Sequence, residues 1–119
     1  MNKLPDELRG MLDELKKEGA RSSAVISRDG LVIAADLDAG GYVETFAIMC
    51  ATLMGAAVTA NLELKRGVPE KVTVESTDGK MLILNAGRKA VVVSVIGNGA
   101  EEAVITKQMT RIAEYLKQS

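Results

Sequence analysis

The sequence predicts an α/β (α+β) sandwich, in which a mostly antiparallel five-stranded sheet carries one long helix on one face and two helices on the other. Apolar residues make up 47% of the 119 residues, which is enough for the core of one domain. Helical and strand-like segments follow one another in the order α-β-β-α-β-β-β-α. Short glycine-containing turns join the strands within each group, and such turns pair strands antiparallel. We expect residues 1–119 to form a single domain.

The first helix is expected over residues 5–18. Pro5 suits the first turn of a helix, and the acidic residues that follow it suit the positive end of the helix dipole. Gly19 is the expected stop, because glycine readily takes the left-handed conformation that ends a helix. One stripe of apolar side chains should be buried: Leu4, Leu8, Met11, Leu12 and Leu15.

Two strands are expected next, over residues 22–27 and 31–36. The turn between them ends in Gly30, where glycine can take a positive φ, so the pair is predicted to be a hairpin. A glycine-rich break at residues 38–41 leads into a long helix over residues 42–65. We expect this helix to cover one face of the sheet.

Three more strands are expected over residues 71–77, 80–86 and 89–96. The first alternates between apolar and polar side chains, which suits a strand with one exposed face. The other two are apolar on both faces, so we place them in the middle of the sheet, between helices.

The last helix is expected to begin after Asn98, whose side chain can cap it, with Glu101 and Glu102 in the first turn. We expect it to share the second face of the sheet with the first helix. Its buried stripe would consist of Ile105, Met109, Ile112 and Leu116.

The central helix has an unusual pattern, because residues 45–62 (TFAIMCATLMGAAVTANL) carry no charge and are apolar almost all the way round. Such a helix needs cover on more than one side. The side expected to face the sheet consists of Val43, Phe46, Ala47, Cys50, Leu53, Met54, Ala57 and Leu64. The opposite side carries Thr45, Thr52 and Thr59 at seven-residue spacing, with Ile48, Met49, Gly55, Ala56 and Leu62 beside them.

Small residues at this spacing allow a second helix to approach closely, so the outer side is predicted to be a self-association surface. If the strand over residues 71–77 lies at an edge, its free backbone groups could pair with another copy and join two sheets into one. The competing interpretation is a long core helix with a mildly apolar back. A membrane span is rejected despite the length, because the stretch contains three threonines, an asparagine and five alanines, which favour insertion little.

Catalytic and ligand chemistry find little support in the sequence, so we expect no enzyme, no cofactor and no metal. There is no histidine, and the one cysteine, Cys50, lies on the predicted core side without a basic partner. Asp36 and Asp38 lack further ligands for a metal. The net charge of −1 gives no electrostatic reason for nucleic-acid binding. Turn arginines are interpreted as solvated: Arg28, Arg66 and Arg88.

Several segments resemble one known family. The run SSAVISRDGLVIAADL at residues 22–37 is similar to the first hairpin of roadblock / dynein light chain proteins. The alanine-rich AIMCATLMGAA at residues 47–57 resembles the family's central helix, and VTVESTDGKMLILNAGRKAVVVSV at residues 72–95 its last three strands. The resemblance covers nearly the whole chain in the right order.

The resemblance implies a profilin-like sandwich and a homodimer with a continuous sheet. Members of this family act as scaffolds and as regulators of small Ras-like GTPases, so the implied partners are a second copy and such a GTPase, in the cytoplasm. One set of residues would form the dimer face and the neighbouring docking surface, with the division between the two left open. The set comprises Glu44, Thr45, Ile48, Met49, Thr52, Ala56, Thr59 and Glu63 on the central helix and Lys71, Thr73 and Glu75 on the following strand.

Two other functions remain open at this point. Profilin-like sheets can hold ligands between sheet and helices, so the chain could be a small-molecule sensor, although the sequence shows few aromatic residues and no polar cluster that would orient a ligand. Alternatively, the same surfaces could make it a structural subunit of a larger motor or membrane-surface complex.

Overall fold

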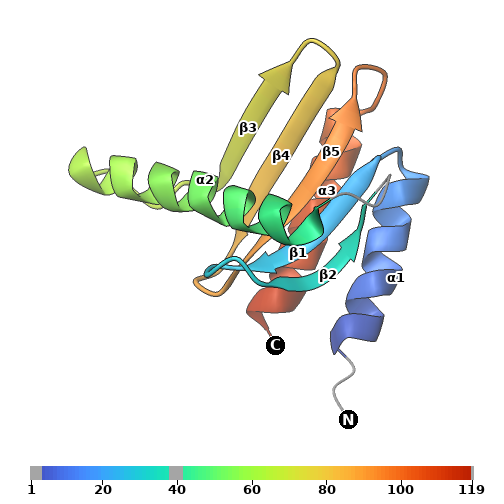
Figure 1. Cartoon of the computed structure of the whole chain (residues 1–119), viewed down its shortest axis with the longest axis horizontal. Coiled ribbons are helices and arrows are strands. Elements are labelled where there is room, and N and C mark those ends of the chain that lie inside the picture. The colour runs from blue at the N-terminus through green and yellow to red at the C-terminus, as the bar shows by residue number, and fades with distance from the viewer. Residues whose placement is uncertain (1–3, 38–41, 119) are drawn as a thin grey trace.

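The computed structural model describes residues 4–37 and 42–118, and side chains from residue 6 onward in the first helix. The expected glycine-rich break at residues 38–41 lies outside the described residues. The elements follow the predicted order α-β-β-α-β-β-β-α (Figure 1). They are α1 (Leu4–Lys17), β1 (Ser22–Ser27), β2 (Val32–Asp36), α2 (Val43–Glu63), β3 (Lys71–Ser76), β4 (Gly79–Ala86), β5 (Ala90–Gly97) and α3 (Glu102–Lys117).

The five strands form one sheet in the order β2-β1-β5-β4-β3, and every neighbouring pair is antiparallel. The two strands that are apolar on both faces, β4 and β5, lie inside the sheet, as their pattern predicts. The edges are the two short strands β2 and β3. The strand predicted to alternate, β3, is therefore an edge strand.

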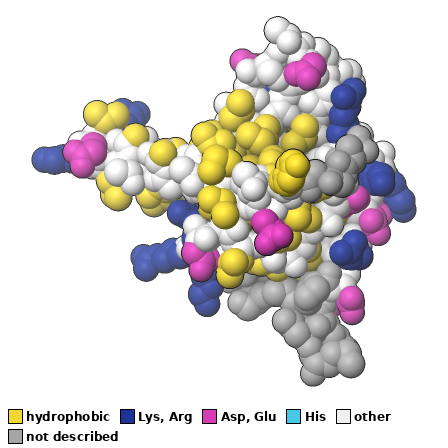
Figure 2. Space-filling model, viewed as in Figure 1, with side chains coloured by type: hydrophobic (Ala, Val, Ile, Leu, Met, Phe, Trp, Pro, Cys, Tyr) yellow, Lys and Arg dark blue, Asp and Glu magenta, His cyan; other side chains and the backbone are white. Residues whose placement is uncertain are grey.

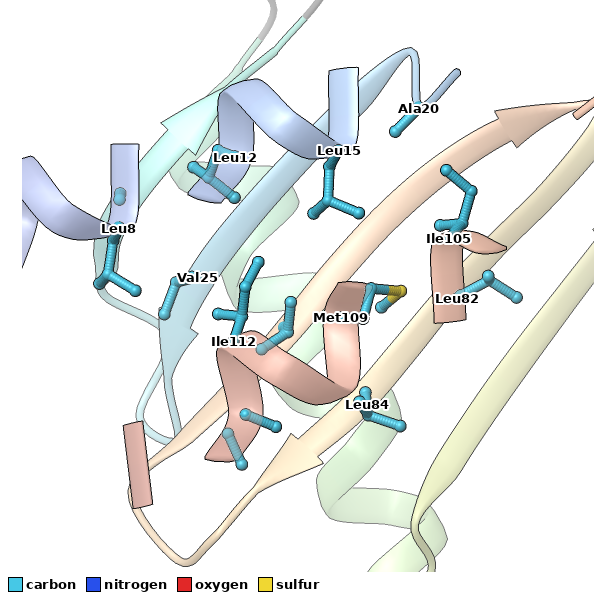
Figure 3. Packing of buried hydrophobic residues seen from close by; sticks show 14 of the residues in the cluster. Leu8, Leu12, Leu15, Ala20, Val25, Leu82, Leu84, Ile105, Met109 and Ile112 are labelled. Atoms are coloured by element: carbon cyan, nitrogen blue, oxygen red, sulfur yellow. The ribbon is translucent and has the colours of Figure 1, made fainter. Parts of the chain in front are cut away.

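One face of the sheet is covered by α1 and α3, which together bury the larger part of the core (Figure 3). Their side chains pack against those of the inner strands, including Val25 of β1 and Leu82 and Leu84 of β4. The predicted stripes are confirmed at Leu8, Leu12, Leu15, Ile105, Met109 and Ile112, all of which are fully buried.

The other face carries α2 alone, so all three helices lie where they were predicted. Ala47, Cys50 and Met54 pack against Ile83 of β4 and Val93 of β5. The small side chains on this helix face let its backbone lie close to the sheet.

The helix ends follow local chemistry, with one correction. Gly19 ends α1 at a φ of +112°, as predicted. The prediction that Asn98 caps α3 is wrong, because its amide donates instead to the Thr77 carbonyl at 2.9 Å and holds the turn after β5 against that before β4. The helix starts later, with Glu101 at the cap position and Glu102 in the first turn.

Candidate interaction surface on helix α2 and strand β3

The outer side of α2 faces away from the sheet. Ile48 is 50% exposed and Met49 is 52% exposed, on the same side as the threonines of the seven-residue repeat. Figure 2 shows hydrophobic side chains gathered where α2 crosses the sheet and again on its far end. All of the helix residues predicted for the interface are exposed: Glu44, Thr45, Ile48, Met49, Thr52, Ala56, Thr59 and Glu63.

The second half of α2 leaves the sheet and projects beyond its edge as an arm (Figure 1). Every buried residue of the helix lies between Ala47 and Met54, and among the described residues 55–63 none is buried. This half is therefore covered on its inner side only in part, where Val58 packs against the core beneath α2, and its outer side carries no charge before Glu63.

Two positions predicted to face the sheet are corrected. Leu53 and Leu64 were expected to face the sheet, but Leu53 is 37% exposed and Leu64 is 70% exposed. Leu64 lies directly after the last residue of α2. Leu62, predicted on the outer side, is 63% exposed, so apolar side chains surround the end of the arm.

The end of the arm has a defined structure. Lys65 takes a left-handed conformation with φ of 57°, and the Asn61 side-chain amide donates to the Gly67 carbonyl at 2.9 Å. The Arg66 amide also donates to the Asn61 carbonyl at 2.8 Å. These bonds fold the connection back onto the helix, so the chain turns sharply from the arm into β3.

Strand β3 extends the surface along the sheet edge. Among the described strands it pairs only with β4, so the backbone groups on its other side have no partner strand. The predicted residues Lys71, Thr73 and Glu75 are all exposed, and Val74 on the opposite face is exposed as well. One edge of β3 is thus open in the single chain, and Val72 is the residue of the strand that is half-buried, against the core beneath α2.

The charges of this edge are paired within the chain. Lys80 lies 3.2 Å from Glu75 and 2.7 Å from Glu102, and Lys71 lies 3.6 Å from Glu102. The hydrogen bond between Lys80 and Glu102 raises the pKa of Lys80 and lowers that of Glu102. Because these charges are satisfied internally, the edge carries little net charge that would repel a second copy.

The one cysteine near this surface is a buried core residue. Burial raises the pKa of the Cys50 thiol to about 11, so it is almost fully protonated at neutral pH. Its sulfur lies 3.9 Å from that of Met81, inside the core beneath α2. Within the described part of the chain, no group of three or more acidic, cysteine or histidine residues could hold a metal ion.

Helix α2 is the one described helix that is long and apolar enough to cross a membrane. The sheet topology excludes a single crossing, because α2 connects β2 to β3 and a crossing would place these strands on opposite sides of the bilayer. Both strands belong to the same hydrogen-bonded sheet.

The layered architecture defines the class of protein first: it is a profilin-like α/β sandwich. Profilin II of Acanthamoeba castellanii superposes with a TM-score of 0.61 at 15% identity, over 87% of this chain and 90% of the profilin. This agreement confirms the predicted fold class.

The sequence then defines the family. The model of the Roadblock/LC7 domain matches residues 10–95. Two proteins of Methanocaldococcus jannaschii, MJ0310 and MJ1340, are 35% and 32% identical over 109 residues, which cover 92% of this chain and 95% of each relative. The chain belongs to the Roadblock/LC7 family, as the resemblance of its hairpin and central helix predicts.

Solved structures of this family share the fold. An MglB with a tetrameric arrangement has a TM-score of 0.88 at 20% identity, over 99% of this chain and 90% of that one. The gliding protein MglB of Thermus thermophilus has a TM-score of 0.86 at 20% identity, over 99% and 91%. A Roadblock/LC7 domain from Streptomyces avermitilis has a TM-score of 0.84 at 19% identity, over 92% and 93%.

Proposed function

We propose that this protein is a non-catalytic, cytoplasmic homodimer that binds a small Ras-like GTPase and modulates its nucleotide state or serves as its scaffold. The observation that carries the proposal is the projecting half of α2, which has no buried residue and carries no charge before Glu63. A stable arm of this kind needs a second protein surface, because apolar side chains that remain in water forgo the free energy of burial.

A second copy of the chain is the cover that fits this geometry. If two β3 strands pair antiparallel about a twofold axis, the two sheets become one continuous sheet. The arm of each copy would then extend over the sheet of the other copy. Small residues recur along the outer side of α2, so two α2 helices can pack closely: Thr52, Gly55, Ala56 and Thr59. Full burial of Ile48, Met49 and Leu62 would contribute roughly 1.5–3 kcal/mol each.

The proposed GTPase would dock on the remaining outer surface of the paired helices. Family membership supports this partner, since the roadblock resemblance implies GTPase regulation. Because the site contains a buried, protonated thiol and no histidine, an effect on hydrolysis or exchange would arise from the selection of one switch conformation of the GTPase.

The substitution Thr52→Glu tests this proposal. Thr52 is exposed on the outer side of α2, and its hydroxyl donates to the Ile48 carbonyl at 2.7 Å. A glutamate there would place an unpaired charge in the helix pair and is expected to dissociate the dimer. The matched control is Thr110→Glu on α3, where an exposed threonine donates in the same way to the Thr106 carbonyl at 2.9 Å, on the opposite face of the sheet.

Two readouts separate the two halves of the proposal. Light scattering should show a monomer for Thr52→Glu and a dimer for Thr110→Glu. In affinity capture from the native lysate, wild type and Thr110→Glu should retain a Ras-like GTPase that Thr52→Glu loses. A dimer that persists in Thr52→Glu contradicts the placement of the interface, and a dimeric wild type that retains no GTPase contradicts the partner and favours a structural subunit.

A further inference from the structure

A cavity of about 630 Å³ lies away from the outer side of α2, where the β4–β5 turn, the connection before β3 and the C-terminal end of α3 meet. Its volume falls within the range of small-molecule sites in proteins. Much of its wall is apolar, including Val58, Val68, Leu84 and Ala113. Leu84 and Ala113 belong to the buried core, so the floor of the cavity is rigid.

The same cavity brings three cations together: Arg28 from the β1–β2 turn, Arg88 from the β4–β5 turn and Lys117 from α3. Two carboxylates, Glu70 and Glu114, also line it. Glu114 lies 3.6 Å from Lys117, whereas neither arginine forms an ion pair with any residue that the structure describes. Three cations against two carboxylates leave the lining with one net positive charge.

Arg28 is held in a fixed orientation, contrary to its interpretation as a solvated turn residue. Its Nη2 donates to Oδ1 of Asn85 at 2.6 Å, and Nδ2 of Asn85 donates to the Pro69 carbonyl at 2.6 Å. The backbone amide of Arg28 also donates to the Lys89 carbonyl at 2.8 Å, which ties the two turns together. Figure 1 shows these turns side by side at the same end of the sheet.

The Arg28 guanidinium has unused hydrogen-bonding capacity. Its Nε is shielded from solvent and has no acceptor among the described residues. A guanidinium has five N–H donors in a planar fork that matches a carboxylate, and a buried donor without a partner is unfavourable. The Asn85 amide therefore orients the Arg28 guanidinium at the cavity wall, and part of the hydrogen-bonding capacity of that guanidinium stays unused.

We propose that this cavity binds a small organic carboxylate with an apolar body. The carboxylate would lie against Arg28 and Arg88, and the apolar part would pack along Leu84 and Val58. A monoanion matches the single net positive charge, whereas Glu70 disfavours a group with two negative charges. The cavity is formed within one chain, so this proposal does not depend on the dimer or on the GTPase.

Octanoate is the probe that tests the site, with octanol as the neutral comparator of the same chain length. We expect octanoate to bind saturably in an NMR titration and to shift amide signals around the cavity, and octanol to bind at least about tenfold more weakly. The double variant Arg28→Gln/Arg88→Gln should weaken octanoate binding at least about tenfold. The matched control is Arg9→Gln/Arg111→Gln, which removes two exposed arginines outside the cavity and should leave the affinity unchanged.

A second variant keeps the test independent of folding. Arg88→Gln/Lys117→Gln alters only exposed side chains of the cavity and leaves the bond between Arg28 and Asn85 in place, so it should fold normally and still weaken octanoate binding. Absence of saturable binding by the wild type overturns the proposal. Equal affinity for octanol, shifts confined to residues that do not line the cavity, or unchanged affinity in both cavity variants overturn it as well.

Discussion

The surroundings of Cys50 determine how its thiol behaves. The thiol lies beneath α2 in contact with core residues of the sheet, and burial raises its pKa from 9.0 to about 11. A thiol in such surroundings behaves as a small apolar side chain and reacts slowly. Cys50 is therefore part of the core packing that anchors the first half of α2 to the sheet.

The raised pKa of Cys50 predicts a pH dependence. Because the folded pKa exceeds the unfolded value, the protonated thiol stabilises the fold fully below about pH 9, and this contribution is lost as the pH rises toward about 11. We expect the free energy of unfolding, measured by denaturant titration, to fall over this range. Cys50→Ala should show a smaller decline, and equal slopes in the two proteins would contradict the assignment.

Gly79 makes a second prediction at the scale of a residue. It opens β4 at φ of +152°, and a Cβ there would lie 2.1 Å from the Ile96 carbonyl oxygen. We expect Gly79→Ala to lower the free energy of unfolding by at least about 2 kcal/mol, since both backbone strain and a clash must be relieved. Gly99→Ala is the matched control, because a Cβ at Gly99 meets nothing within 4 Å, and it should be nearly neutral.

Among the elements, α2 is the one with two different halves. Its first half is anchored by buried small side chains and Met54, whereas its second half extends past β3 with no buried residue among those described. The connection back to β3 is fixed by Asn61, so the arm keeps a defined direction. A rigid, uncovered apolar element beside an open strand edge is typical of an interface between protein chains.

Two methionines of α2 distinguish the anchoring role from the interface role. Met54 is fully buried, so Met54→Ala should reduce the stability of the fold by about 2–5 kcal/mol. Met49 is exposed in the single chain, so Met49→Ala should change the stability of the monomer little and weaken the dimer. Denaturant titrations at low protein concentration and light scattering at high concentration measure the two effects, and a strongly destabilised monomer of Met49→Ala would contradict this division.

At the scale of the whole molecule, much of the architecture could be predicted from periodicity. The stripes of α1 and α3, the hairpin turns and the inner position of β4 and β5 all follow from local patterns. The exposure of Leu53 and Leu64 could not be predicted, because it depends on the strand order and on the direction in which α2 crosses the sheet. The side chain of Asn98 likewise bonds to Thr77, which is distant in sequence. A local capping pattern gives no information about such a partner.

The candidate surfaces were predictable to different degrees. The outer residues of α2 could be identified from their lack of charge and their seven-residue spacing, because both are properties of one helix. The cavity around Arg28 could not, since its side chains come from two turns, one connection, β4, α2 and α3. Only the folded chain shows that Asn85 orients that arginine.

The most direct test of the central claim is the solution mass of the wild-type protein, measured by light scattering over a dilution series. We expect a dimer with a mass of twice 12.6 kDa that persists at low concentration, because pairing would cover the arm of α2 and complete the edge of β3. A monomer that persists at high concentration would contradict the account, since the arm would then be stable without a second surface.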